Sequence, residues 1–350
     1  MKILLVARRY PPDVRSGTET VFENLYMQAR KKHDVRLVVG YRNDRALVPP
    51  EAVAVDLRGK GASAYIKLAQ AATLEARRFK PDIVLANSIE VFVPGVPTVV
   101  IVHDLNFGGA QKTLSTKMKE LFYQLRSLQV YKIITVSEAS QKRLIQAGLA
   151  PHRIEIVRNG VDLDRFVPKP RPPDGLVRFA YPSRMIPGKG QHVLIDAFGR
   201  LRPDQKKNLR LTLVGAMADT IYADRLKLES YHQPIDLHFD VPDIVPYYQN
   251  ADVIVFPTRM EEGFGFTAVE GMACGLPVIW SEQPAIREAT GGIGVPVPME
   301  DPDALKAAIL RLASDQEARE KLGQEGRAFV ERYRWEKVWE GYEKVLAGAI

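Results

Sequence analysis

The sequence predicts an α/β protein with two doubly wound, Rossmann-like domains in tandem. Short aliphatic or β-branched runs alternate with longer segments of helical periodicity, a pattern typical of parallel sheets built from β-α units. A chain of 350 residues also exceeds what one hydrophobic core usually serves. We therefore expect two domains that face one another across a cleft, with ligands at the carboxyl ends of the strands.

Six runs in the first half have the composition of buried strands. They lie at 2–7, 35–39, 82–87, 98–104, 132–137 and 153–159. Helical periodicity fills intervals near 18–32, 64–79, 111–130 and 138–147. This half should therefore form one complete sheet with its covering helices.

A proline-rich segment, 164–175, predicts the domain boundary, because Pro168, Pro170, Pro172 and Pro173 exclude a helix or a central strand. The expected domains are residues 1–167 and 168–334, with a final helix at about 335–350 that packs back on the first domain. Six further strands are expected at 177–183, 209–215, 235–240, 252–257, 277–280 and 294–298. Helical sequence follows from about 301 to 348.

Composition narrows the class of protein. The single cysteine, Cys274, excludes an internal disulfide, and the first apolar run, 3–7, is short for a signal peptide. No run is long enough to span a membrane, so we expect a cytoplasmic protein. Residues 1–170 hold 27 Lys and Arg against 16 Asp and Glu. Nucleic acid, an anionic membrane or a phosphorylated acceptor would suit this basic half, as would a merely solvated surface.

Three places combine glycine, cations or polar side chains with the end of a predicted strand. Gly17 precedes a helix whose free N–H groups can bind an anion, although the G-x-G-x-x-G pattern of a dinucleotide site is absent. His103 and Asp104 end a strand, where they can act on a hydroxyl or simply pack. Arg184 and Lys189 flank a Pro-Gly turn before a helix, which suits a diphosphate or, alternatively, a solvated pair of cations.

A glycine-rich bend separates two glutamates in EEGFGFTAVEGMACGLPVIW, residues 261–280. Glu262 is expected in a loop after a strand, and Glu270 in the helix that follows. Between them, successive backbone N–H groups can turn toward an anion or sugar oxygens. These residues are Gly263, Phe264, Gly265, Phe266 and Thr267. Each part has a plainer structural explanation, but the combination favours a binding site.

These motifs resemble the retaining glycosyltransferases of the GT-B fold, family 4 (glycosyl transferases group 1). The family pattern E-G-F-G-x-x-x-x-E, followed by G-x-P-V-I, is matched by 262–270 and 275–279. YPPDVRSGTE is similar to the family's first loop, SRMIPGKG to its R-x-x-x-x-K-G donor segment, and NGVDLDRF to its N-G-V-D stretch. The resemblance extends over nearly the whole chain.

The resemblance implies a hexosyltransferase that moves a hexose from UDP-hexose or GDP-mannose to a glycan or glycolipid acceptor, with retention. The first domain would bind the acceptor and the second the nucleotide sugar. Arg184 and Lys189 would hold the diphosphate, Glu262 and the amides after it the donor sugar, and Glu270 the ribose. Such an enzyme would serve cell-surface polysaccharide or lipopolysaccharide synthesis.

Further roles follow from the same resemblance. His103 would reach the transferred sugar, Gly17 would let the first domain close on the phosphates, and the backbone near Val241 would meet the base. The leaving phosphate would take the acceptor's proton, without a cofactor or a metal. Two departures stand out: Ser16 precedes Gly17 where the family usually has a second glycine, and Asp240 replaces a common glycine, so the donor base stays open.

Two alternatives concern the acceptor and the partner. Two segments, 64–80 and 112–132, are helical and amphipathic with basic residues. Such a helix can lie on an anionic membrane at the inner face of the cell membrane, or pack on its own sheet. The acceptor could instead be a soluble small molecule, as in a disaccharide synthase or phosphorylase. A non-catalytic nucleotide or nucleic-acid module would give the glutamates and cations no purpose, so no nucleic-acid partner is expected.

Overall fold

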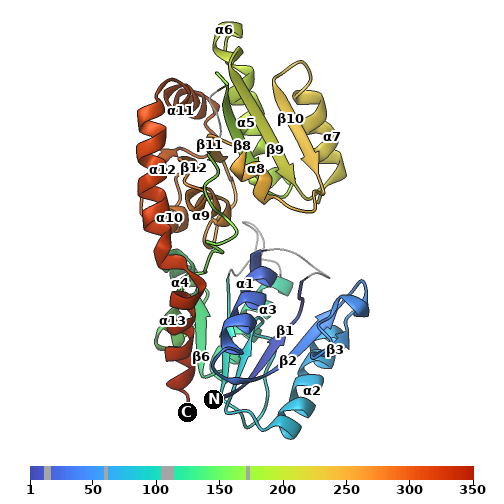
Figure 1. The fold of residues 1–350 in the computed structure, drawn as a ribbon. Coiled ribbons are helices and arrows are strands. Elements are labelled where there is room, and N and C mark those ends of the chain that lie inside the picture. Colours follow the sequence, from blue (N-terminus) through green and yellow to red (C-terminus); the bar gives the residue numbers. More distant parts are fainter. Residues whose placement is uncertain (12–16, 59–61, 104–113, 171–173) are drawn as a thin grey trace. The chain divides into compact units, whose positions relative to one another are not determined.

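The computed structural model describes residues 1–11, 17–58, 62–103, 114–170 and 174–350. Residues considered above that lie outside these ranges are Ser16, Asp104, Pro172 and Pro173. The chain forms two compact units, Met1–Gly160 with Trp335–Ile350, and Val161–Arg334. Each unit has its own parallel sheet with helices on both faces, which confirms the predicted fold class (Figure 1).

The first sheet has seven parallel strands in the order β3-β2-β1-β4-β5-β6-β7. The strands are β1 Lys2–Ala7, β2 Asp34–Tyr41, β3 Val53–Asp56, β4 Ile83–Ala86, β5 Thr98–Ile101, β6 Lys132–Thr135 and β7 Ile154–Ile156. Strand order reverses between β1 and β4, and open sheets bind ligands at the carboxyl ends of strands at such a point. The sequence does not predict β3, because this edge strand has four residues, one of them buried.

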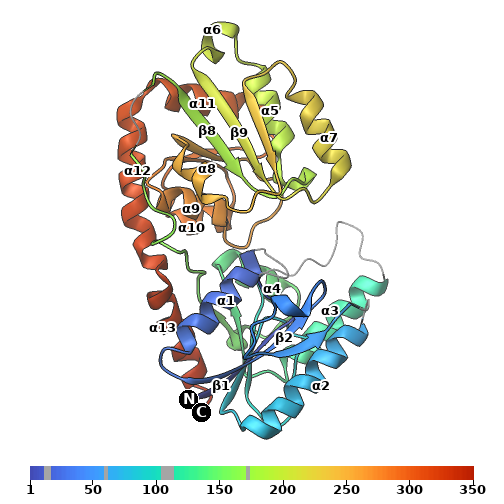
Figure 2. The same ribbon diagram turned by 45° about the vertical axis from the view of Figure 1, so that its right-hand side comes forward.

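Helices cover both faces of the first sheet (Figure 2). Their bounds are α1 Gly17–Ala29, η1 Arg45–Leu47, α2 Ala62–Phe79, α3 Leu114–Ser127, α4 Glu138–Gln146, η2 Pro151–Arg153 and α13 Trp335–Ala347. α2 covers one face, where Leu4, Val6 and Leu68 are fully buried in one core cluster. α1 and α13 pack together on the other face. Residues 3–7 of β1 are buried throughout, as expected for a strand covered on both sides.

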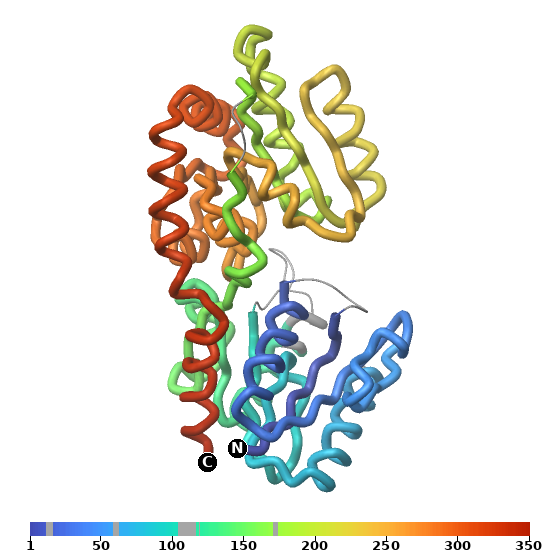
Figure 3. The backbone as a smooth tube through the Cα atoms, viewed as in Figure 1, coloured from blue at the N-terminus to red at the C-terminus, as the bar shows by residue number. Residues whose placement is uncertain are grey.

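α13 returns to the first unit, so both chain ends belong to it (Figure 3). His33 contacts Glu343 at 2.8 Å, and Gln28 donates to Glu336 at 3.2 Å. Gly160 marks the chain's exit from the unit, where a Cβ would lie 2.4 Å from a Trp335 ring atom.

The second sheet has six parallel strands in the order β10-β9-β8-β11-β12-β13. They are β8 Val177–Pro182, β9 Leu209–Gly215, β10 Ile235–Phe239, β11 Val253–Phe256, β12 Val278–Ser281 and β13 Val295–Val297. The helices are η3 Pro187–Lys189, α5 Gln191–Gly199, α6 Pro203–Lys206, α7 Thr220–Glu229, α8 Val245–Gln249, α9 Phe266–Ala273, α10 Pro284–Thr290, α11 Pro302–Ser314, α12 Gln316–Val330 and η4 Glu331–Tyr333. Here strand order reverses between β8 and β11.

The units divide between Gly160 and Val161, earlier in the chain than the expected boundary between 167 and 168. The proline-rich segment therefore lies within the second unit. Asp162 forms a local turn there, because its carboxylate accepts the backbone N–H of Arg165 at 3.0 Å. Within the described ranges, no helix is both long and apolar enough to cross a bilayer.

Candidate functional site

The turn after β8 places a lysine at the start of α5. Lys189 ends η3, and Gly190 takes φ +76° as the residue before α5. A Cβ on Gly190 would lie 2.1 Å from the carbonyl oxygen of Pro257, so glycine is required for this turn to approach the end of β11. Arg184 is exposed, and Gln191 donates to its backbone carbonyl at 2.8 Å.

Two neighbouring side chains contact Glu262, in the loop after β11. Nζ of Lys189 lies 2.6 Å from its Oε1, and the hydroxyl of Thr258 donates to the same oxygen at 2.8 Å. Only 14% of each charged side chain is exposed, so the ion pair is largely shielded from water. β8 and β11 are neighbours in the sheet, so their loops meet where strand order reverses.

Gln283 holds the loop that carries Glu262. Its Oε1 accepts the backbone N–H of Glu262 at 3.1 Å, and its Nε2 donates to the carbonyl of Met260 at 2.8 Å. Gln283 is 6% exposed and precedes α10. These bonds satisfy backbone groups that the protein would otherwise bury without a partner, so they fix the position of the glutamate.

α9 begins at the Gly-Phe-Gly bend. Gly265 precedes the helix with φ +91° and provides no side-chain cap, so the N–H groups of Phe266 and Thr267 point out of the helix end. Phe264 is buried, with its ring centroid 5.2 Å from that of Tyr333, and this contact anchors the bend. The helix end can therefore offer amide donors and the positive end of its dipole to an anion.

Glu270, in the same helix, has a different environment. Its Oε2 accepts a 2.6 Å hydrogen bond from the hydroxyl of Tyr248 in α8. Burial raises the pKa of Glu270 to about 7, and the hydrogen bond from Tyr248 opposes this shift. Burial also raises the pKa of the Tyr248 hydroxyl well above 10, so the tyrosine remains the donor.

Val241 follows β10 and is half-buried. Asp240 before it has φ +51°, in the left-handed region that favours glycine. The Asp240 carboxylate accepts the backbone N–H of Met217 at 2.9 Å, a bond between the segments that follow β9 and β10, and this bond stabilises the conformation. The aspartate thus departs from the family's common glycine but keeps the backbone conformation that glycine would take.

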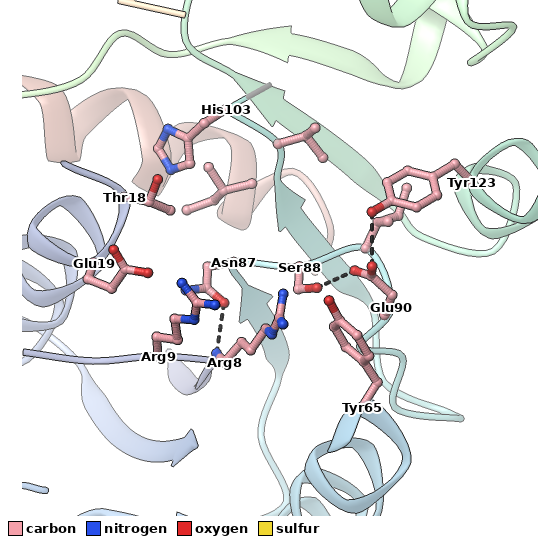
Figure 4. A pocket seen from close by; sticks show the side chains of 13 residues that line it. Arg8, Arg9, Thr18, Glu19, Tyr65, Asn87, Ser88, Glu90, His103 and Tyr123 are labelled. Carbon is pink, nitrogen blue, oxygen red and sulfur yellow. Dashed lines mark hydrogen bonds between the residues drawn. The ribbon is translucent and has the colours of Figure 1, made fainter. Parts of the chain in front are cut away.

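The first unit has its own pocket, with a volume of about 360 Å³, at the carboxyl ends of β1, β4 and β5 (Figure 4). Its charged and polar lining includes Arg8, Arg9, Glu19, Ser88, Glu90 and His103. Glu90 accepts hydrogen bonds from the hydroxyls of Ser88 and Tyr123, the latter at 2.9 Å. Asn87 accepts the backbone N–H of Arg8 at 3.0 Å, which joins the ends of β1 and β4.

His103 lines this pocket from the end of β5. Burial lowers its pKa to about 4, so the imidazole is neutral at physiological pH. Its Nε2 is buried and has no hydrogen-bond partner in the part of the chain that the structure describes. Gly17 begins α1 with an exposed backbone, and Thr18 beside it lines the pocket.

The structure thus brings Lys189 and Glu262 into direct contact and places the Gly263–Thr267 bend beside them in sequence. Glu270 lies in a separate buried pair with Tyr248, and His103 and Gly17 belong to the first unit. Sequence reasoning missed the side chains that hold these groups, Thr258, Gln283 and Tyr248. Thr258 lies two positions after the end of β11 and could have been predicted from the sequence. Gln283 and Tyr248 come from other elements and left no local signal.

No group of three or more His, Cys, Asp or Glu side chains in the described ranges could hold a metal ion. Asp162 and Asp164, which are two positions apart, belong to the turn described above. The Asp164 carboxylate pairs with Arg334 at 3.1 Å. Metal independence stays a prediction.

Two family models match successive parts of the chain. Residues 164–329 match the model described as Glycosyl transferases group 1, and residues 15–165 match Glycosyltransferase Family 4. The chain belongs to this glycosyltransferase family. The two matches meet at 165, so each model accounts for most of one sheet and its loops.

Curated relatives of this glycosyltransferase share between a quarter and a third of their aligned residues with it. An uncharacterized glycosyltransferase of Methanocaldococcus jannaschii is 28% identical over 71% of this chain and 68% of that protein. The D-inositol 3-phosphate glycosyltransferase of Streptomyces bingchenggensis is 26% identical over 62% of this chain, and CapM, a capsular polysaccharide biosynthesis glycosyltransferase of Staphylococcus aureus, is 27% identical over 61%. The match spans 52% and 60% of the last two relatives, less than two thirds of either.

Solved structures share the GT-B fold of this glycosyltransferase. Anabaena Alr3699/HepE in complex with UDP and glucose has a TM-score of 0.81 at 20% identity, over 99% of this chain and 100% of that one. Sucrose-phosphate synthase from Thermosynechococcus elongatus has a TM-score of 0.82 at 18% identity, over the same shares. At these identities the likeness establishes the fold.

Proposed function

We propose that the chain transfers a hexose from a nucleotide diphosphate sugar, UDP-hexose or GDP-mannose, to a glycan or glycolipid acceptor. The product would belong to a cell-surface polysaccharide or lipopolysaccharide, and the transfer would retain the anomeric configuration without a metal ion. CapM, named for capsular polysaccharide biosynthesis, and the Anabaena protein with UDP and glucose support this class of product and donor.

The ion pair of Lys189 with Glu262 carries the proposal, because it places a cation and a carboxylate together between two helix N-termini. The donor's diphosphate takes Lys189 and Arg184 as counter-ions, and the amides at the starts of α5 and α9 add to their field. Glu262 accepts hydrogen bonds from hydroxyls of the hexose, and Glu270 from those of the ribose. The backbone near Val241 meets the base.

The chemistry is a substitution at the anomeric carbon on one face of the sugar. The bond from this carbon to the diphosphate oxygen breaks, the bond to the acceptor hydroxyl oxygen forms, and the leaving phosphate takes the acceptor's proton. Lys189 and Arg184 stabilise the negative charge that develops on the leaving group. The first unit binds the acceptor, with His103 directed to the transferred sugar and Gly17 allowing close approach to the phosphates.

A soluble acceptor is the second candidate. D-inositol 3-phosphate glycosyltransferases among the relatives, and the structural similarity to sucrose-phosphate synthase, favour an acceptor that is a small sugar or polyol. The donor half of the proposal is the same in both cases.

A panel of nucleotide sugars tests the donor half. A donor that binds the native state raises its thermal stability in proportion to ln(1 + [L]/Kd), so UDP-hexoses, GDP-mannose and NAD are compared by thermal shift. We expect one nucleotide sugar to stabilise the protein and to be slowly hydrolysed, also in EDTA, and Lys189→Ala to abolish both effects. NMR of the anomeric proton in the transfer product then tests retention. If no nucleotide sugar binds or is hydrolysed, the proposed function is wrong.

We also propose that the first unit contacts an anionic membrane through α3, at the inner face of the cell membrane. Four apolar side chains recur along this helix at three- and four-residue spacing, Met118, Leu121, Phe122 and Leu125, and Leu128 follows the helix end. These five side chains are between 39% and 66% exposed. Lys117 and Arg126 lie on the same helix and would meet anionic headgroups.

Vesicle sedimentation tests this contact. Vesicles of phosphatidylglycerol and phosphatidylcholine should sediment the wild type and not Lys117→Glu combined with Leu125→Ser. Lys321→Glu, an exposed change of the same charge on α12, is the matched control and should bind like the wild type. Equal binding by all three proteins would contradict the α3 surface.

A further inference from the structure

The pocket of the first unit has more cationic hydrogen-bonding capacity than the protein itself uses. Arg8 and Arg9 enter it from the end of β1 (Figure 4). The Nε atoms of both side chains are buried and have no hydrogen-bond partner among the residues that the structure describes. Such donors are rare and costly in folded proteins, so they mark a place where an acceptor-rich ligand would be stabilised.

Charge crowding around Arg9 favours an anion. Burial lowers the pKa of Arg9, and the neighbouring charges of Arg8 and Arg42 lower it further, against the opposite effect of Glu19. Like charges held this close destabilise the protein alone, and a bound anion would relieve that repulsion. The crowded arginines therefore lower the stability of the ligand-free protein and favour the binding of an anion.

Besides Glu19, the pocket is lined by a second carboxylate, that of Glu90. Glu90 accepts hydrogen bonds from Ser88 and Tyr123, which are neutral hydroxyl donors. The guanidinium of Arg8 instead lies over the ring of Tyr65, with its carbon 4.6 Å from the ring centroid. This contact positions Arg8 without neutralising its charge.

We propose that this pocket binds an oxyanion, a phosphate or a carboxylate, carried by the sugar or polyol acceptor of the transfer. The planar guanidinium groups of Arg8 and Arg9 match both oxyanions through paired N–H donors. The volume of about 360 Å³ suits a ligand the size of a monosaccharide phosphate.

The location supports an acceptor rather than an unrelated anion. The pocket lies at the carboxyl ends of β1, β4 and β5, at the reversal of strand order where open α/β sheets bind their ligands. That the anion belongs to the acceptor rests on the proposed function, whereas anion binding itself depends only on the first unit.

The test compares ligands that differ only in charge. Glucose, glucose 6-phosphate, glucuronate and inorganic phosphate are titrated into the full chain by calorimetry, without a donor. We expect the charged sugars to bind at least about tenfold more tightly than glucose, a difference of about 1.4 kcal/mol. Arg9→Gln should remove that difference. Equal affinities for glucose and its charged analogues, or no binding of any charged probe in the millimolar range, would overturn the proposal.

Two controls separate this role from a structural one. Arg45→Gln makes the same change of charge at an exposed position of η1 and should leave the affinities unchanged. Arg9→Gln should raise the melting temperature, because it relieves the repulsion among the arginines, whereas a residue that holds the fold together would lower it. A lowered melting temperature with unchanged anion affinity would refute the assignment.

Two further arms identify the source of the anion. Glycerol 3-phosphate presents the phosphate group on a soluble molecule, and a short-chain phosphatidylglycerol presents it in a lipid headgroup. The ligand that binds with the higher affinity identifies the source of the anion. Donor binding by Arg9→Gln is measured in parallel. If Arg9→Gln still binds the donor but no longer binds the anion, the inference is supported. If the wild type binds the anion but no nucleotide sugar, the proposed function is wrong and the anion site is retained.

Discussion

Lys189 and Glu262 form an ion pair in which Nζ lies 2.6 Å from Oε1, although both residues are proposed to bind the donor. Each therefore neutralises the other in the ligand-free protein. A donor whose diphosphate meets the lysine and whose hydroxyls meet the glutamate would replace a contact that the protein already satisfies. This arrangement keeps two charges that are each 14% exposed from being buried alone.

Removal of one partner should reduce both stability and turnover. Lys189→Met leaves the Glu262 carboxylate without its cation, which we expect to lower the free energy of unfolding by about 3 kcal/mol. Turnover should fall by about 10²- to 10³-fold, since the leaving phosphate loses its stabilising charge. Urea unfolding and steady-state kinetics measure the two effects. The double variant Lys189→Met/Glu262→Leu should regain stability and remain inactive; recovered activity would show that the pair is only structural.

Donor affinity should rise with pH around neutrality. Burial raises the pKa of Glu270 from 4.5 to about 7, and the ionised carboxylate accepts ribose hydroxyls more strongly than the protonated form. Calorimetric titration of the nucleotide sugar between pH 5.5 and 8.5, about one and a half units on either side of this pKa, should show the rise. Glu270→Gln should bind weakly and without this dependence. A wild-type affinity that is constant over the range would contradict the assignment.

The same group should make the protein less stable as pH increases. Between the unfolded pKa of 4.5 and the folded pKa of about 7, the folded state binds more protons than the unfolded state, so the free energy of unfolding falls as pH rises through this window. Denaturant titrations of the wild type and Glu270→Gln at several pH values isolate the contribution. A wild-type slope that matches that of Glu270→Gln would show that Glu270 is ionised throughout.

Gln283 should control the position of Glu262. Gln283→Leu leaves the Glu262 N–H and the Met260 carbonyl without their partners, which we expect to cost about 1 to 3 kcal/mol. kcat should fall more than KM rises, because the diphosphate contacts are untouched. Gln283→Glu keeps an oxygen acceptor for the Glu262 N–H and should retain more of kcat. Equal kcat values for the two variants would argue against positioning through that N–H.

Gly265 is required at the start of α9 for two separable reasons. It has φ +91°, and a Cβ would lie 3.2 Å from the Phe256 ring and 3.5 Å from Ile286. Gly175 is the matched control, with φ +77° and, among the described residues, no atom within 4 Å of the position that a Cβ would take. Gly175→Ala should cost about 1 kcal/mol from backbone strain, and Gly265→Ala about 1 to 3 kcal/mol more from overpacking. Equal losses in thermal unfolding would assign the whole effect to strain.

The sequence was sufficient for the architecture and for the loops that carry the site. Both sheets follow from aliphatic runs alternating with helical periodicity, a local signal, and the four-residue edge strand β3 is too short to give one. The loops at Lys189 and Glu262 follow strand ends, so their convergence could be inferred from parallel topology.

What the sequence could not supply are contacts between distant segments. Gln283 meets the backbone of Glu262 across 21 positions, and Asn87 meets that of Arg8 across 79. The Arg-Arg pair after the first strand is visible in the sequence. Its partial burial, and the pocket it lines, depend on the strand order that brings β4 beside β1.

The return of α13 to the first unit has a consequence for synthesis on the ribosome. The second unit is a continuous stretch, Val161–Arg334, whereas the first needs residues 335–350 as well. During translation, the second unit can therefore fold to completion while the first still lacks the helix that covers α1. Until α13 emerges, the face of α1 that packs against it is uncovered, so the continuous unit can be complete before the discontinuous one.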